Sequence, residues 1–420
     1  MSSFFLPAVR RSILLMALPL AMAGAVRADE VTDWHEHMLV ALGKAGLRPP
    51  VSTREAALVS SAVFDSVNGI ELRYTPIFVA PGAPRGASKR AAAVQAAYVI
   101  LLARFPAQAD DFVAKRTASL AAIGEEGESM RRGINWGQKV ADKILLWRSM
   151  DGFSPPPPPY WGSLEEGKWR PTPPAFAPGL LPQLATMTPW AMRSPDQFRP
   201  AGPPALGSAR YLADFNEVKL MGSANSPLRT EDETELCRFA ADTSGTYVWN
   251  RLAIDLAAED GYELSENAKL LATLNLAMAD SVIACWDAKY HFELWRPITA
   301  IRLEDADGDG NPDDPGWTPL ISTPPHPEYT SGHSSNYGAA ATVLAAYFGE
   351  DTPFFLESQA DPTRVRFYPN FSAAIDEVAK ARVYAGIHFR TACDDAVAAS
   401  SAIADYVMEN LMLRLHGEGE

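Results

Sequence analysis

The sequence predicts an all-α protein in which two helical bundles are joined by a proline-rich irregular strap. Apolar residues recur at steps of three and four through several long stretches, which is typical of amphipathic helices. Strand-like alternation of apolar and polar residues is rare. Fifteen of the 34 prolines fall between residues 154 and 204, where neither regular helix nor a central strand can form.

Composition excludes several classes of protein. The 420 residues are 47% hydrophobic and 21% charged, so the chain can bury a large core and is not a disordered polyampholyte. Its formal net charge of −14 argues against a nucleic-acid partner, because phosphate binding needs a basic surface. The three cysteines allow at most one disulfide, so this is not a disulfide scaffold; they are Cys237, Cys285 and Cys393.

The first 28 residues are predicted to be a secretory signal peptide. Arg10 and Arg11 precede an apolar run over residues 12–26, and small residues at Val26 and Ala28 offer a cleavage site. An ordinary Sec signal and a twin-arginine signal are both compatible with this pattern. We therefore expect an exported protein, periplasmic or secreted, with no membrane partner. A later apolar stretch at 270–285 is interrupted by polar residues and is expected to be a buried helix.

The N-terminal helical half is expected to cover residues 29–150. Alanine, valine and leucine at helical spacing predict helices at 54–67 and 89–105, and Pro106 would end the second. The strap would follow over residues 151–210. It carries large aromatic residues that a disordered linker seldom has, so we expect it to be ordered; they include Trp161, Trp169, Phe176, Trp190 and Phe198.

The C-terminal helical half is expected to cover residues 211–420. Thr230 is a typical N-cap residue and three acidic residues follow it, so a helix should begin there. The helical pattern continues through residues 267–295, 331–348 and 372–412. This half contains three segments that we expect to form one site for an oxyanion.

The first segment contributes two cations. Lys289 and Arg296 are seven residues apart, so both would lie on one face of a helix that Pro297 ends. A solvated basic face is the simpler interpretation. The many aromatic residues around them nevertheless favour burial, and buried cations need a partner.

The second segment runs from Pro325 to Ser335, and Ser331 and Gly332 would open a helix within it. The amides at a helix N-terminus bind anions, and Gly332 would let an oxyanion approach the backbone closely. His333 in the first turn could exchange protons with that anion. The alternative is a capping serine followed by a histidine without a role.

The third segment places Arg382 and His388 six residues apart in a helical pattern, near one face. A lone histidine on such a face is usually a core residue, but the nearby arginine favours a ligand. The three segments together supply three cations, two histidines and no carboxylate cluster. This set suits a tetrahedral oxyanion, phosphate or vanadate, better than Ca²⁺ or Mg²⁺.

The order and spacing of these residues resemble a known family signature. Lys289-x6-Arg296-Pro297, Ser331-Gly332-His333 and Arg382-x5-His388 are similar, in order, to the three-part signature of the type 2 phosphatidic acid phosphatase superfamily. Within it the chain most resembles the soluble vanadium-dependent haloperoxidases. The resemblance implies that His388 ligates vanadium and that His333 is the acid–base residue. It also implies a set that holds the vanadate oxygens: Lys289, Arg296, Ser331, the Gly332 amide and Arg382.

The implied reaction is the oxidation of halide by hydrogen peroxide to hypohalous acid, with Lys289 polarising the bound peroxide. Trp286 and His326 fall where the family lines its halide pocket, and a histidine at the second position favours bromide or iodide over chloride. The alternative is a secreted acid phosphatase in which His388 attacks a phosphomonoester and forms phosphohistidine. The oligomeric state stays open.

Two features depart from simple expectations. Phosphatase members of the superfamily carry an aspartate four residues after the ligand histidine, and here that position is Ala392, so the residue that orients His388 is not identified. The segment from Asp305 to Asp313 resembles the first half of a calcium loop. The glutamate expected at its twelfth place is replaced by Gly316, so an aspartate-rich turn is favoured and calcium is only an alternative cofactor.

Overall fold

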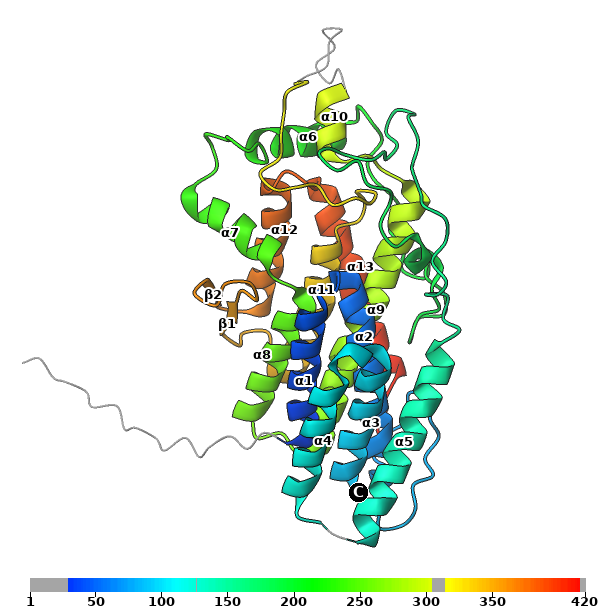
Figure 1. Cartoon of the computed structure of the whole chain (residues 1–420). Helices are drawn as coiled ribbons and strands as arrows, with labels where there is room; N and C mark the ends of the chain where they lie inside the picture. Colours follow the sequence, from blue (N-terminus) through cyan, green and yellow to red (C-terminus); the bar gives the residue numbers. More distant parts are fainter. Residues whose placement is uncertain (1–28, 126, 304–313, 416–420) are drawn as a thin grey trace, which may run out of the picture.

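The computed structural model describes residues 29–125, 127–303 and 314–415. The predicted signal peptide and the calcium-like segment 305–313 therefore lie outside the described residues. Within them the fold is all-α, as predicted, with a single short hairpin that was not predicted. Figure 1 shows α1 to α5 in its lower part and the C-terminal helices above and behind them.

The N-terminal half consists of α1 (Glu30–Ala45), α2 (Pro49–Glu71), α3 (Lys89–Arg104), α4 (Ala109–Ile123) and α5 (Glu128–Arg148). The two helices predicted here correspond to α2 and α3. Two glycines of α5 allow it to lie directly on α3: a Cβ on Gly133 or Gly137 would lie 2.3 Å from a carbonyl oxygen of that segment. Helix α2 is buried over almost its whole length and forms part of the shared core.

The strap between α5 and α6 is irregular apart from one short 3₁₀ helix, η2 (Pro182–Thr186). It is ordered, as predicted, because side chains of α9 hold it. The carboxylate of Asp280 accepts hydrogen bonds from the backbone N–H groups of Trp190, Ala191 and Met192, at 2.7, 2.8 and 2.9 Å. This buried carboxylate satisfies three amides that the irregular backbone would otherwise leave unpaired.

The C-terminal half consists of the following helices: α6 (Ala209–Met221), α7 (Glu231–Asp242), α8 (Gly245–Glu259), α9 (Leu264–Phe292), α10 (Pro297–Leu303), α11 (Gly332–Phe348), α12 (Phe371–Tyr384) and α13 (Arg390–Asn410). An antiparallel hairpin, β1 (Phe354–Glu357) and β2 (Val365–Tyr368), joins α11 to α12, with Phe354 opposite Tyr368. Thr230 caps α7 as predicted.

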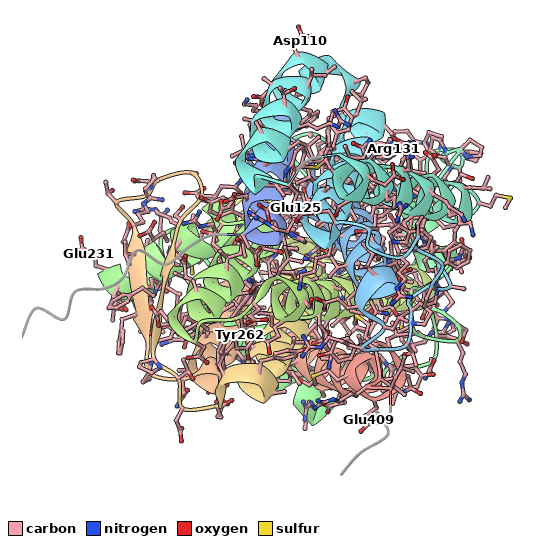
Figure 2. All side chains as sticks on the ribbon, turned by 90° about the horizontal axis from the view of Figure 1, so that it is seen from below. Asp110, Glu125, Arg131, Glu231, Tyr262 and Glu409 are labelled. Carbon is pink, nitrogen blue, oxygen red and sulfur yellow. The ribbon has the colours of Figure 1, made fainter. Side chains whose placement is uncertain are left out.

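Helix α9 lies beside α2, α11 and α13, and one apolar core extends across both halves (Figure 1). In the part of the chain that the structure describes, α9 is the one helix long and apolar enough to cross a membrane, but 94% of its most apolar window is buried inside the fold. Charged side chains such as Asp110, Glu231 and Glu409 lie at the periphery instead (Figure 2).

Two predicted helices end earlier than expected. Helix α9 stops at Phe292, so Arg296 lies after it in an extended segment, immediately before α10. The stretch 372–412 is divided into α12 and α13 by a turn at Gly386, whose φ of +81° favours glycine. A Cβ at that position would also lie 2.4 Å from the carbonyl oxygen of Gly222. The three cysteines are all free and buried.

Candidate active site

The three sequence segments converge on one cavity of about 380 Å³. It lies between the end of α9, the first turn of α11, the end of α12 and the turn before α13. Six of the nine predicted site residues line it: Trp286, His326, Gly332, His333, Arg382 and His388. The other three, Lys289, Arg296 and Ser331, are fully buried beside it.

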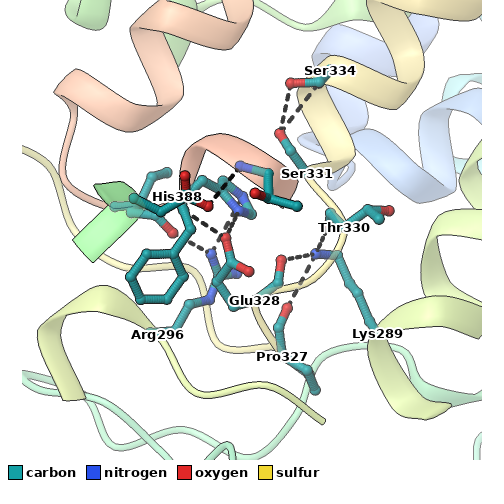
Figure 3. Close-up of polar contacts among 12 residues, drawn as sticks. Lys289, Arg296, Pro327, Glu328, Thr330, Ser331, Ser334 and His388 are labelled. Atoms are coloured by element: carbon teal, nitrogen blue, oxygen red, sulfur yellow. Dashed lines mark hydrogen bonds and ion pairs between the residues drawn. The ribbon is translucent and has the colours of Figure 1, made fainter. Parts of the chain in front are cut away.

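Lys289 holds the loop that precedes α11. Its ammonium donates hydrogen bonds to the carbonyl oxygens of Pro327 at 3.1 Å and Glu328 at 3.0 Å, and to that of Thr330 (Figure 3). Burial lowers the pKa of Lys289 to about 8. Since all three N–H groups have carbonyl partners, Lys289 sets the path of the loop. Its predicted contact with an oxyanion, which would require exchange of one partner, stays a prediction.

Arg296 does not share a helix face with Lys289, because α9 has already ended; that part of the prediction is wrong. Its guanidinium instead joins two loops. Nε donates to the His326 carbonyl at 2.8 Å and Nη1 donates to the Ile387 carbonyl at 2.8 Å. Nη1 also lies 3.3 Å from His388 Nε2, and Nη2 lies 2.8 Å from His326 Nδ1. The extended backbone after α9 is what lets one arginine reach both histidine segments.

Glu328 orients His388. Its Oε1 accepts hydrogen bonds from His388 Nδ1 at 2.7 Å and from the Phe389 amide at 2.9 Å (Figure 3). With the proton on Nδ1, the lone pair of Nε2 faces Arg296 Nη1 at 3.3 Å, and exchange of that contact would make it available to a ligand atom. Burial raises the pKa of Glu328 to about 7, although the charges of Arg296 and Lys289 oppose this shift.

Sequence analysis missed this carboxylate. The phosphatase pattern would place the partner of His388 downstream of it, where Asp395 instead accepts a hydrogen bond from the Tyr329 hydroxyl at 2.6 Å. The sequence did offer one signal, since Glu328 is the only acidic residue between His326 and Ser331. The prediction that Arg382 and His388 share a helix face is also wrong, since α12 ends at Tyr384 and His388 lies in the following turn.

Among the described residues, Arg382 forms no ion pair with a carboxylate. It lies in the last turn of α12 with 3% of its surface exposed, and its buried Nε and Nη1 atoms form no hydrogen bond in the structure. Burial lowers its pKa to about 10, so the guanidinium stays charged at neutral pH. Buried donors are nearly always paired, and an isolated buried charge is costly. The orphan donors at the cavity wall therefore fit an anionic ligand.

The N-terminus of α11 faces the same cavity. Ser331 is the N-cap, as the capping interpretation predicted: its hydroxyl accepts a hydrogen bond from the Ser334 amide at 3.3 Å (Figure 3). Gly332, the first residue of α11, lines the cavity. Its amide is one of the unpaired N–H groups at a helix start, where the helix dipole favours an anion.

Two further histidines complete the site. Burial and the charges of Arg382 and Lys289 lower the pKa of His333 well below its usual value, so without an anion the ring is neutral. Burial also lowers the pKa of His326, whose ring lies 5.2 Å from that of Trp286. The Trp286 indole is fixed by a hydrogen bond to the Leu180 carbonyl of the strap at 3.1 Å.

Three comparisons with known proteins agree. Residues 269–417 match the family model described as the VCPO second helical-bundle domain. A vanadium chloroperoxidase from Curvularia inaequalis is 33% identical over 115 residues, which cover 23% of this chain and only 18% of that protein. The fold is similar to a solved bacterial vanadium-dependent iodoperoxidase, with a TM-score of 0.80 and 26% identity over 92% of this chain and 98% of the other.

The fold is also similar to that of a solved bacterial vanadium-dependent chloroperoxidase, with a TM-score of 0.66 and 19% identity over 86% of this chain and 92% of the other. The matched domain contains all three segments that build the cavity. The signature residues, the family-model match over residues 269–417 and the shared fold make the chain similar to the vanadium-dependent haloperoxidases.

Proposed function

We propose that this protein uses hydrogen peroxide to oxidise halide to hypohalous acid at a vanadate group. The observation that carries the proposal is the unpaired guanidinium of Arg382, which faces the same cavity as the ring of His388. A buried cation with free donors beside a nitrogen lone pair suits an oxyanion whose central atom accepts that lone pair.

The residues present fit vanadate. His388 Nε2 would be the ligand atom, since Glu328 keeps the proton on Nδ1. Arg382, Arg296 and the Gly332 amide would hold the oxygens, with Ser331 and Lys289 fixing the backbone around them. Bound vanadate would supply a Lewis acid that activates peroxide without a redox change at the metal.

His333 would move the protons. It lines the cavity from the first turn of α11, and its ring is neutral in the absence of an anion. A neutral imidazole can take a proton from arriving hydrogen peroxide. The negative oxyanion would stabilise the resulting imidazolium, which can then return the proton as the peroxide O–O bond breaks.

Bromide or iodide is proposed as the halide in preference to chloride. Trp286 and His326 face the cavity side by side, and Arg296 holds the His326 ring from behind. A polarisable aromatic wall suits a large, weakly hydrated halide better than a small one. The similar bacterial structure described as an iodoperoxidase supports this preference.

Export across a membrane is also proposed. Asp29 caps α1 with its side chain, accepting from the amides of Val31 and Thr32. Cleavage after Ala28 would leave this cap intact. Sequencing the N-terminus of protein recovered from the periplasm or the medium should give Asp29 as the first residue. An uncleaved chain confined to the cytoplasm would contradict export.

One assay distinguishes the candidate reactions. Protein freed of oxyanions should gain bromide and iodide oxidation by peroxide when vanadate is added, and lose it in excess phosphate. Hydrolysis of a phosphomonoester without vanadate, with no gain of peroxidase activity, would favour the phosphatase alternative at the same site. Activity that followed an added divalent metal and ignored phosphate would refute both.

A further inference from the structure

The cavity is larger than its proposed inorganic substrates require. Its volume of about 380 Å³ is in the range of pockets that enclose a small organic molecule. Vanadate, peroxide and one halide ion are each only a few non-hydrogen atoms in size, and one water molecule needs only about 10–15 Å³ of such a cavity. We call Lys289, Arg296 and Arg382 the cation cluster. The other walls of the cavity are largely apolar and come from α2, the strap, α9 and the loop before α11: Pro50, Leu180, Val282, Ile321, Pro324 and Pro325.

One polar group on these walls lacks a partner. Asn336 lies one turn after His333 on α11, lines the cavity and is 7% exposed, and its Oδ1 forms no hydrogen bond in the structure. Gly245 leaves room for it, since a Cβ there would lie 2.1 Å from Oδ1. A buried carboxamide is normally hydrogen-bonded. A ligand hydroxyl fits either end of it, because a hydroxyl both donates and accepts.

A positively charged residue also lines the cavity. Arg48 precedes α2, is exposed and lines the cavity, and its guanidinium has no ion pair among the described residues. Five residues along α2, the Thr53 hydroxyl lies 3.0 Å from that of Thr246, which follows Gly245. Arg48 and Asn336 both line the cavity, so a ligand that carries a carboxylate and a hydroxyl would meet a charged partner for one group and a carboxamide for the other.

We propose that this cavity binds the organic halogen acceptor, a phenolic carboxylate, with its hydroxyl at Asn336 and its carboxylate toward Arg48. This proposal rests on the proposed halide oxidation. The aromatic ring is then halogenated before hypohalous acid leaves the cavity. Halide loses two electrons to peroxide, whose O–O bond breaks. The ring forms a carbon–halogen bond and releases its proton. Overall, one ring C–H, one halide ion, one H₂O₂ and one proton give the halogenated ring and two waters.

Binding can be measured without vanadate. Calorimetric titration of metal-free protein in excess phosphate, which keeps the carboxylate away from the cation cluster, should show one site for 4-hydroxybenzoate. Asn336→Leu should weaken 4-hydroxybenzoate by about tenfold but leave benzoate unchanged, as expected for one lost hydrogen bond. Arg48→Gln should weaken 4-hydroxybenzoate but leave phenol unchanged. No saturable binding, or equal affinity for all three compounds in every variant, would overturn the proposal.

Product ratios provide a second readout. In a mixture of 4-hydroxybenzoate and phenol with bromide and peroxide, the vanadate-loaded enzyme should favour 4-hydroxybenzoate by roughly fivefold more than reagent hypobromous acid does. Ile321→Trp, which narrows the cavity away from the cation cluster, should restore the reagent ratio. A reagent-like ratio from the unaltered enzyme would show that hypohalous acid reacts outside the cavity. Tribromide formation without any organic acceptor reports bromide oxidation alone and so tests the proposed function separately. Failure of acceptor binding can therefore be distinguished from failure of halide oxidation.

Discussion

The ring of His388 and the carboxylate of Glu328 form a buried pair, with Nδ1 and Oε1 2.7 Å apart and neither side chain more than 3% exposed. The pair fixes the tautomer of the ring and aims Nε2 away from the carboxylate. The second oxygen, Oε2, has no hydrogen-bond partner in the structure. Glu328 therefore acts through His388, as a positioning residue.

Replacing Glu328 by glutamine should weaken vanadate binding by about ten- to a hundredfold, the usual cost of losing such support behind a ligand histidine. Glutamine is close in size and can still accept from Nδ1, but it removes the charge that raises the basicity of the ring. Equilibrium dialysis with vanadate measures the affinity. The matched control is Asp395→Asn, which alters a nearby carboxylate that contacts Tyr329 and not His388. Equal losses in both variants would contradict the role of Glu328.

Replacing His388 and His333 one at a time should separate their roles. His388→Ala removes the proposed ligand nitrogen, so vanadate binding should be lost while the helical content in circular dichroism is kept. Unchanged vanadate affinity in this variant would mean that the wrong histidine has been assigned.

His333→Ala should retain vanadate and lose most turnover, by about a hundred- to ten-thousandfold, which is typical of a lost general acid–base group. The loss should fall on the peroxide-dependent step, measured by varying peroxide at saturating halide. If His333→Ala lost vanadate as His388→Ala does, His333 would instead be a support for the anion.

The helices were predictable wherever apolar spacing extended over several turns. The pattern identified α2, α3 and α11, and the proline content identified the strap. It failed at the ends of α9 and α12. Leu294 and Trp295 continue the apolar pattern past α9, through backbone that is no longer helical, and the apolar pattern likewise continues past α12 through the turn at Gly386. The hairpin was missed because each of its strands has only four residues. Phe355 and Phe367, which pair across the two strands, also face solvent, contrary to a simple burial pattern.

The site was predictable in its members but less so in its geometry. Spacing along the chain brought together the residues that line the cavity, yet it placed Arg296 and His388 on helix faces instead of in loops. Glu328 was missed because its contact with His388 depends on the tertiary fold. Asn336 was missed because its unpaired Oδ1 is likewise visible only once the surrounding elements are in place. The unpaired state of Arg382 is likewise a property of burial, which no local pattern reports.

Acidification should destabilise the metal-free protein below about pH 6.5. Burial lowers the pKa of His35 to about 4, where its ring bonds to the Val31 carbonyl and the Ser60 hydroxyl. The unfolded chain takes up the proton near pH 6.5, so the stabilisation is present above that pH and is lost as the pH falls toward 4. The difference between the two pKa values limits the loss in free energy of unfolding to roughly 3 kcal/mol. Chemical denaturation at several pH values should show a smaller pH dependence in His35→Gln. An equal pH dependence would exclude His35 as its source.

Arg382 should lower the folding stability of the oxyanion-free protein while it enables the anion to bind. Its buried guanidinium has two unpaired donors and no carboxylate partner in the part of the chain that the structure describes. Arg382→Met should therefore raise the free energy of unfolding of the oxyanion-free protein by about 1–3 kcal/mol. The same change should abolish vanadate-dependent peroxidase activity. In thermal melts, phosphate or vanadate should raise the Tm of the unaltered protein, because each binds only the folded state, and should leave the Tm of the variant unchanged.

Arg390→Met is the matched control, because that arginine is already paired with Glu217 at 2.6 Å and lies outside the cavity lining. It should lower stability slightly and keep the shift in Tm with phosphate. If Arg382→Met destabilised the oxyanion-free protein, or still responded to phosphate, the guanidinium would be part of the scaffold and not a site for the anion.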